Sequence, residues 1–200
     1  MCQTNEGITI ADNMEEKKEE SFFKEIFRFA IITLVVVLPI RFFIAEPFIV
    51  SGASMEPTFE DTDYLIVDRI TYSLENPERN DVIIFRYPKN PEKYFIKRII
   101  GLPEETVTIS GNNITIRNKN NPEGFNLDQT YITFKSEGKF QVTLKKDEYF
   151  VMGDNRSHSS DSRIWGAVPR ENIIGRAFLR LFPPKSIDIF PGKINSEERV

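Results

Sequence analysis

The chain has 200 residues, enough for one medium-sized core with attachments. Its formal net charge of -4 is opposite in sign to the basic surface of a general nucleic-acid binder, so we expect no nucleic-acid partner. The chain has one cysteine, Cys2, and one histidine, His158, so neither an internal disulfide nor a Cys- or His-rich metal site is expected. We therefore expect neither a metal nor a cofactor.

The N-terminal part of the chain is predicted to be a polar tail, residues 1–22, followed by a membrane anchor, residues 23–45. The tail mixes acidic and basic side chains without apolar periodicity, which is typical of disorder. The uncharged stretch 29–40, with the apolar residues on either side of it, gives about 20 residues, roughly one bilayer crossing. A cleaved secretory signal and a buried core helix are the alternatives. Ala45-Glu46-Pro47 is a poor cleavage site, because proline just past the cut is unfavourable.

Basic residues are more frequent before the apolar segment than after it. Those before it are Lys17, Lys18, Lys24 and Arg28. Only Arg41 lies between the apolar segment and Arg69. Because basic residues favour the cytoplasmic side, we expect a single-pass protein of the cell membrane with a cytoplasmic N-terminus and residues 46–200 on the extracytoplasmic side.

Residues 46–200 are predicted to form an all-β ectodomain, with an inserted β region at about residues 104–148. Short apolar runs bounded by turn residues are typical of buried strands. The runs are residues 47–50, 64–67, 82–85, 94–100, 106–109, 114–116, 140–144 and 149–152, and the last apolar element is 172–182. The turn Ser110-Gly111-Asn112-Asn113 predicts a hairpin. No amphipathic helix longer than a few turns follows the anchor.

Ser54 lies in a turn-forming segment, Ser51-Gly52-Ala53-Ser54-Met55-Glu56-Pro57-Thr58. Gly52 allows a tight turn and the close approach of another chain, and Pro57 prevents a helix from running through the segment. An ordinary surface turn is the alternative to a functional one. Nine residues separate the hydroxyl from the end of the anchor, so it can lie no more than roughly 30 Å from that end.

Lys97 and Arg98 are adjacent cations within an apolar strand. Because side chains alternate between the two faces of a strand, one of the two cations is expected to face the interior. The alternative is that Lys97 is exposed and that Arg98 pairs with a carboxylate. Burial of Lys97 would lower its pKa, and a neutral amine can act as the base that a hydroxyl nucleophile requires. Ser54 and Lys97 are therefore the candidate catalytic pair.

The segment from Gly153 to Arg163 is polar and dense in hydrogen-bonding groups. Its possible ion-pair members are Asp154, Arg156, Asp161 and Arg163. A polar loop closed by its own ion pairs is the simplest interpretation. The segment also offers an alternative base, His158, in a triad with Ser54 and an aspartate. Polar residues flank His158 on both sides and no apolar neighbour fixes its position, so this triad is less favoured than the Ser–Lys pair.

Four ordered blocks of the sequence resemble the bacterial type I signal peptidases, or leader peptidases, which are membrane-bound proteases with a Ser–Lys dyad. The blocks are residues 51–58, 80–85, 94–103 and 153–163, and with the anchor the likeness extends from about Phe22 to Phe182. The resemblance implies that Ser54 is the nucleophile and Lys97 the general base. It further implies that Ser159 helps to hold this lysine and that Asp161 and Arg163 form a supporting ion pair.

The sequence departs from the family pattern at two positions. Gly52 replaces a serine whose hydroxyl helps to form the oxyanion hole in some members, so the oxyanion would depend on backbone N–H groups, notably that of Ser54. Glu104 replaces a glycine, which should alter a turn and leave the chemistry unchanged. Members with two spans and a large second β-domain are poor guides to residues 104–148, because this chain has one span and a modest insertion.

The resemblance implies an endopeptidase that removes N-terminal signal peptides from exported preproteins at the membrane surface, through an acyl-enzyme. Signal peptides end in small residues that suit shallow apolar pockets, and Val50, Met55 and Ile96 are candidates to line them. The expected partners are preprotein signal peptides and the lipid bilayer. Two other classes stay open: a cytoplasmic self-cleaving repressor of the related Ser–Lys fold, and a membrane-tethered β adaptor without catalysis.

Overall fold

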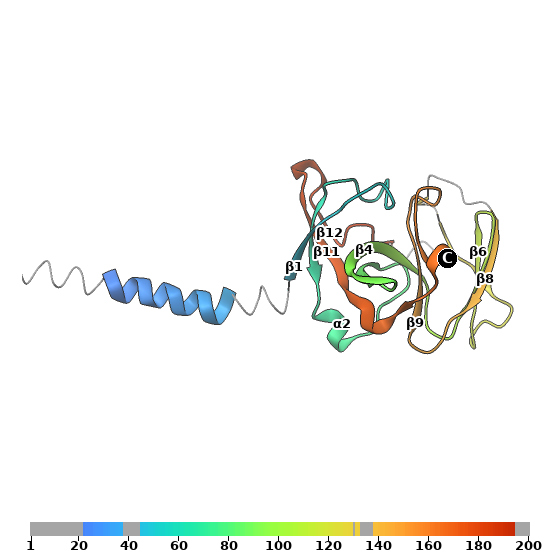
Figure 1. The fold of residues 1–200 in the computed structure, drawn as a ribbon, viewed down its shortest axis with the longest axis horizontal. Helices are drawn as coiled ribbons and strands as arrows, with labels where there is room; N and C mark the ends of the chain where they lie inside the picture. The colour runs from blue at the N-terminus through green and yellow to red at the C-terminus, as the bar shows by residue number, and fades with distance from the viewer. Residues whose placement is uncertain (1–21, 38–44, 130, 133–137, 195–200) are drawn as a thin grey trace, which may run out of the picture. The chain divides into compact units, whose positions relative to one another are not determined.

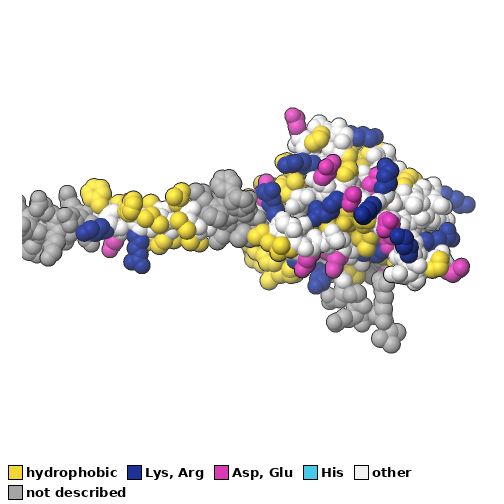
Figure 2. Space-filling model, turned by 90° about the horizontal axis from the view of Figure 1, so that it is seen from below, with side chains coloured by type: hydrophobic (Ala, Val, Ile, Leu, Met, Phe, Trp, Pro, Cys, Tyr) yellow, Lys and Arg dark blue, Asp and Glu magenta, His cyan; other side chains and the backbone are white. Residues whose placement is uncertain are grey.

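The computed structural model describes residues 22–37, 45–129, 131–132 and 138–194, and the chain divides into two units after Ile44 (Figure 1). In the first unit, residues 22–32 form an α-helix that continues as the π-helix η1 (Thr33–Val37). Most of the apolar side chains of this helix are exposed (Figure 2). Within the described residues, none of the helices combines the length and the apolar character that a bilayer crossing requires. Residues 38–44 of the expected anchor and residues 1–21 of the expected tail lie outside the described part of the chain.

The second unit is built from two antiparallel sheets (Figure 1). The larger sheet has the order β1-β2-β11-β3-β4-β9-β10, and β12 pairs with β11. Its strands are β1 (Ala45–Ile49), β2 (Tyr64–Asp68), β3 (Val82–Tyr87), β4 (Asn90–Gly101), β9 (Glu148–Met152), β10 (Val168–Pro169), β11 (Ile173–Phe182) and β12 (Asp188–Ile189). The smaller sheet has the order β7-β6-β5-β8, from β5 (Thr106–Ser110), β6 (Asn113–Arg117), β7 (Phe125–Asn126) and β8 (Lys139–Thr143). The fold is mostly β, as the sequence predicted.

The helical elements of the second unit are short. They are α2 (Thr71–Leu74), α3 (Ser162–Trp165), η3 (Arg170–Asn172) and η4 (Pro184–Ser186). The smaller sheet comes wholly from within the segment 104–148.

Most strands form where the apolar runs predicted them, whereas the short strands β7, β10 and β12 were not predicted. β4 begins at Asn90 instead of residue 94, because its polar N-terminal half pairs with β3 in a hairpin. Val50 lies just beyond β1, although it was expected within the strand. β7 forms within residues 117–129, a segment without a predicted strand, where Phe125 pairs with Ile116 of β6.

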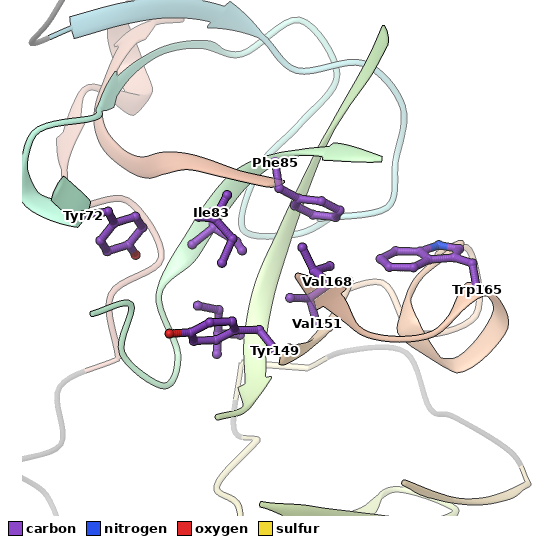
Figure 3. Packing of buried hydrophobic residues seen from close by; sticks show 9 residues of the cluster. Tyr72, Ile83, Phe85, Tyr149, Val151, Trp165 and Val168 are labelled. Atoms are coloured by element: carbon purple, nitrogen blue, oxygen red, sulfur yellow. The ribbon is translucent and has the colours of Figure 1, made fainter. Parts of the chain in front are cut away.

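Three groups of buried apolar side chains pack on the larger sheet, and both of its faces are covered at β3, β4 and β9. One group packs between β3, β4, β9 and α3 and contains Ile83, Phe85, Val151 and Trp165 (Figure 3). The second joins the smaller sheet to β4 and β9, and the third packs against β2, β3 and β11. Because both faces are covered, side chains of either alternation on β4 are buried at its C-terminal half.

Candidate active site

Ser54 lies in the turn that follows β1. Val50 anchors the start of this turn, because its N–H donates to Asp63 O at 2.9 Å and its carbonyl accepts from Thr62 N at 2.9 Å. Gly52 has a φ of +89°, a conformation that L side chains rarely adopt, and its N–H donates to Asp61 Oδ1 at 2.7 Å. The turn is therefore fixed by backbone bonds on one side and by a carboxylate on the other.

Lys97 projects from β4 toward this turn. Its Nζ donates to Ser54 Oγ at 2.7 Å and to the carbonyl of Ile96 at 2.8 Å. The residue is 4 % exposed. The predicted pair therefore meets at hydrogen-bond distance, and both acceptors of the amine are neutral oxygens.

Burial lowers the pKa of Lys97 from its ordinary value of 10.5 to about 8. The negative charges of Asp161 and Asp154 act in the opposite direction and raise this pKa, but the loss of solvation is the larger effect. A substantial fraction of the amine is therefore neutral in mildly alkaline solution, as a general base requires.

The segment 153–163 holds the backbone of the turn that carries Ser54. The N–H of Asn155 donates to Ser54 O at 3.1 Å, and its side-chain amide donates to Ala53 O at 3.0 Å. At Gly153 a Cβ would lie only 2.3 Å from Ser54 O and 2.3 Å from Ser159 Oγ. Only glycine permits this approach, which brings the two segments into contact.

The predicted ion pair between Asp161 and Arg163 is present, with Arg163 NH2 2.8 Å from Asp161 Oδ2. The Asp161 carboxylate also accepts from the N–H groups of Gly153 at 3.1 Å and of Arg163 at 3.2 Å. Arg163 NH2 further donates to Arg156 O at 2.7 Å. The loop is therefore closed on itself, and its start is fixed beside Ser54.

Arg98 is buried as well as Lys97, so both adjacent cations face covered sides of the sheet, where the sequence had predicted one. Arg98 pairs with Asp154 at 2.6 Å, and both side chains are 1 % exposed. Asp154 therefore has its ion partner on β4 and not within its own loop. Arg156 instead donates to Gly153 O at 3.0 Å and to the side chain of Gln129.

Ser159 and His158 occupy different surroundings. Ser159 is buried, and its hydroxyl makes no hydrogen bond with any described residue, so the structure does not place it on Lys97. His158 is exposed and lines the site, but its Nδ1 lies 2.9 Å from Ser157 Oγ and 3.3 Å from Asn155 Oδ1. Both of these groups are neutral, unlike the aspartate that orients the imidazole in a Ser-His-Asp triad.

A cavity of about 320 Å³ opens beside Ser54 and Lys97. It is lined by Phe48, Ile49, Val50, Ser51, Gly52, Ala53, Ser54, Leu65, Ile84, Tyr94, Phe95, Ile96, Lys97, His158 and Ser160. Val50 and Ile96 line it, as the sequence suggested, whereas Met55 is fully buried in the group of side chains that packs against β2 and β3. The aromatic wall of the cavity was not foreseen. Period-2 alternation along β1 could have indicated Phe48, because it shares a face with Val50.

The described residues contain no group of three or more His, Cys, Asp or Glu side chains that could hold a metal ion. The chemical groups of the site are instead a hydroxyl, a buried amine of lowered pKa and an apolar cavity. This combination is typical of the class of serine hydrolases in which lysine takes the place of histidine as base.

Comparison with known proteins agrees with this class. Residues 23–182 match the family model described as signal peptidase, peptidase S26. The chain is 37 % identical over 175 residues to a probable signal peptidase I-2 of Synechocystis sp., covering 84 % of this chain and 78 % of that protein. It is 41 % identical over 162 residues to a signal peptidase I of Leptolyngbya laminosa, covering 76 % of each. A signal peptidase I of Aquifex aeolicus is 34 % identical over 218 residues, covering 81 % of this chain and 85 % of that protein.

The chain belongs to the signal peptidase family, peptidase S26, a family of serine proteases.

Proposed function

We propose that this protein is an endopeptidase that removes N-terminal signal peptides from exported preproteins, with Ser54 as nucleophile and Lys97 as general base. The observation that carries the proposal is the contact of 2.7 Å between Lys97 Nζ and Ser54 Oγ at the edge of the cavity. Membership of the signal peptidase family supports the choice of substrate. Asp161 and Arg163 act as supporting residues, because they close the loop beside the nucleophile.

The mechanism begins with Lys97 in its neutral form. Its lone pair takes the proton of Ser54 Oγ while that oxygen attacks the scissile carbonyl. Backbone N–H groups, notably that of Ser54, stabilise the oxyanion. The protonated lysine then gives its proton to the leaving amine, and an acyl-enzyme forms. Lys97 next activates a water molecule that hydrolyses the acyl-enzyme, which returns both residues to their starting state.

The cavity suits small side chains of an extended substrate. Its wall includes apolar residues of β1 and β4, Ile96 among them, and Val50 just beyond β1, and Ser54 and Lys97 stand at its edge. An apolar wall close to the nucleophile favours small uncharged residues just before the cleaved bond, as found in signal peptides.

The outer face of the larger sheet supports a site at the membrane surface. Cross-strand pairing places Ile49, Tyr64 and Phe182 in one row across β1, β2 and β11. A second row contains Pro47, Ile66, Leu179 and Ile189. Ile49 is 65 % exposed and also lines the cavity, so the apolar face is continuous with the site. Figure 2 shows hydrophobic side chains gathered at the end of this unit where Figure 1 labels β1. We assign the lipid surface as the partner of this face.

The proposed organisation has residues 1–22 as a cytoplasmic tail, 23–45 as a single-pass anchor and 46–200 as the extracytoplasmic catalytic unit, with 104–148 inserted. Protease added to intact spheroplasts should degrade the region after residue 45. Full protection of that region, while periplasmic controls are digested, would contradict this topology.

Cleavage of a purified secretory precursor tests the proposed function. The wild-type protein should release the mature product at one site, and Ser54→Ala should abolish cleavage while leaving the circular dichroism spectrum unchanged. Cleavage of its own chain only would indicate the self-cleaving class. If neither the wild type nor Ser54→Ala cleaved the precursor, the result would favour the membrane-tethered adaptor without catalysis.

A further inference from the structure

The C-terminal segment of the described chain reaches the buried ion pair behind the candidate active site. The Arg98 guanidinium is 1 % exposed, so each of its donors needs a partner inside the protein. Nε and NH2 donate to Asp154, at 2.9 and 2.6 Å. NH1 donates to two backbone carbonyls, Asn80 O at 2.9 Å and Gly192 O at 2.6 Å. Gly192 therefore supplies one of the acceptors that keep this buried charge satisfied.

Gly192 is pressed closely against the residues that surround the ion pair. It has a φ of +77°, and a Cβ there would lie 2.7 Å from Thr58 Cγ2 and 3.1 Å from Arg98 NH2. Residues with a side chain rarely adopt this backbone conformation, and a Cβ at this position would collide with Thr58. The position therefore requires glycine for two independent reasons.

Phe190 fixes this segment to β11. Its N–H donates to Phe178 O at 2.7 Å, and the two rings pack edge to face with centroids 5.2 Å apart. The guanidinium of Arg176 lies 4.8 Å from the centroid of the Phe190 ring. The carbonyl of Gly192 is thus presented to Arg98 by a segment with its own anchor.

The same ion pair is joined to the nucleophile turn and to the loop behind it. Thr58, at the end of the turn, donates from Oγ1 to Asp154 Oδ2 at 2.6 Å. Asn155, which follows Asp154 in the chain, donates its backbone N–H to the carbonyl oxygen of Ser54. Arg98 follows Lys97 directly on β4, so the strand that carries the base is held at the adjacent residue. Five segments, those of Thr58, Asn80, Arg98, Asp154 and Gly192, therefore meet at one buried ion pair.

We propose that residues 190–192 are a positioning element of the catalytic site, with the Gly192 carbonyl holding Arg98 and Asp154 so that Ser54 and Lys97 keep their mutual geometry. This inference rests on the proposed function, because it assigns a role relative to that nucleophile and base. The segment does not line the cavity, so it acts on the chemical step and not on substrate binding.

The test substitutes Gly192→Ala in the full chain and measures precursor cleavage. A displacement of the reacting groups of about 1 Å can cost on the order of 100-fold in rate, so we expect kcat to fall by about 10- to 100-fold with little change in KM. The matched control is Gly138→Ala, because Gly138 has a φ of +100° but no atom of the described residues lies within 4 Å of its added Cβ. It introduces the backbone strain without the collision and should leave kcat unchanged.

A second substitution tests whether the collision with Thr58 causes the loss of kcat. Thr58→Ser removes the methyl group that the new Cβ would meet and keeps the hydroxyl that donates to Asp154. In the Thr58→Ser background, Gly192→Ala should therefore lower kcat less than it does in the wild type. If Gly192→Ala does not fold, Phe190→Ala removes the anchor without adding an atom beside Arg98, and it should lower kcat in the same way.

Two results would overturn the inference. One is a kcat for folded Gly192→Ala equal to that of Gly138→Ala, in a preparation whose wild type cleaves the precursor. The other is a rise in KM at constant kcat, because this would indicate an effect on substrate binding. Lack of cleavage by the wild type itself would contradict the proposed function, and the inference would fall with it.

Discussion

Lys97 and Arg98 are consecutive on β4, but the two sides of the strand give them opposite surroundings. Lys97 faces the cavity edge, where its amine has two neutral acceptors, and burial lowers its pKa to about 8. Arg98 faces the other side, where Asp154 and two carbonyls satisfy it, and hydrogen bonds and the charge of Asp154 hold its pKa above the ordinary value despite burial. Desolvation without a paired charge makes a base, whereas desolvation with a paired charge makes a fixed structural cation.

The largest expected effect comes from replacing Lys97 with arginine, the side chain that stays protonated at the neighbouring position. Lys97→Arg should lower kcat/KM for precursor cleavage by about 10²- to 10⁴-fold, because a guanidinium does not release its proton in this range. Circular dichroism should show that the variant is folded. Substantial turnover by folded Lys97→Arg would remove Lys97 from the role of base.

On the other side of β4, Asp154→Asn tests how much the buried Arg98 depends on its counter-charge. It leaves Arg98 buried without its counter-charge, so the free energy of unfolding should fall by on the order of 3–5 kcal/mol, measured by urea denaturation. Glu104→Gln is the control, because the ion pair of Glu104 with Lys119 is exposed and worth at most about 1 kcal/mol. Equal stability of the two variants would show that the buried pair does not stabilise the fold.

Substitution of Ser159 gives a further test on the Lys97 side of β4. Its buried hydroxyl has no partner in the described structure, and such groups are rare enough to call for a functional explanation. We expect the hydroxyl to orient the amine of Lys97 during the reaction, so Ser159→Ala should lower kcat by about 10- to 100-fold. The melting temperature should not fall, because no hydrogen bond of the resting fold is lost. Ser157→Ala serves as the control, and equal kcat values for the two would mean that Ser159 only fills space beside Gly153.

The last expected effect is the response to pH. With the pKa of Lys97 lowered to about 8, kcat/KM should rise about tenfold per pH unit below 8 and level off above it. His158→Ala should keep the same profile, whereas an acidic limb that disappears in this variant would favour a histidine base.

The same lowered pKa affects stability in a defined direction. Between pH about 8 and 10.5 the unfolded chain binds more protons at this lysine than the folded chain does, so the free energy of unfolding rises with pH through this window. Below pH 8 the cost of burying the cation is fully present, on the order of 3 kcal/mol.

The sequence alone predicted most of the strands from local apolar patterns. It also named Ser54, in a turn-forming segment, and Lys97, within an apolar strand, as the candidate pair. Apolar runs bounded by turn residues identified the strands that deliver Ser54 and Lys97, although not the early start of β4, whose polar residues are ordered by pairing with β3. The resemblance to the family also implied the ion pair of Asp161 with Arg163, which is present in the structure.

The tertiary structure decided what depends on contacts between distant segments. Alternation along β4 could not show that both of its faces are covered, so only the fold revealed that Arg98 is buried with Lys97 and that its partner is Asp154. Met55 follows the nucleophile in sequence, but the turn directs it into the core instead of the cavity. The contact of Gly192 with Arg98 joins residues 94 positions apart, and no local pattern encodes such a contact, because it exists only once β11 and the chain after it have folded back.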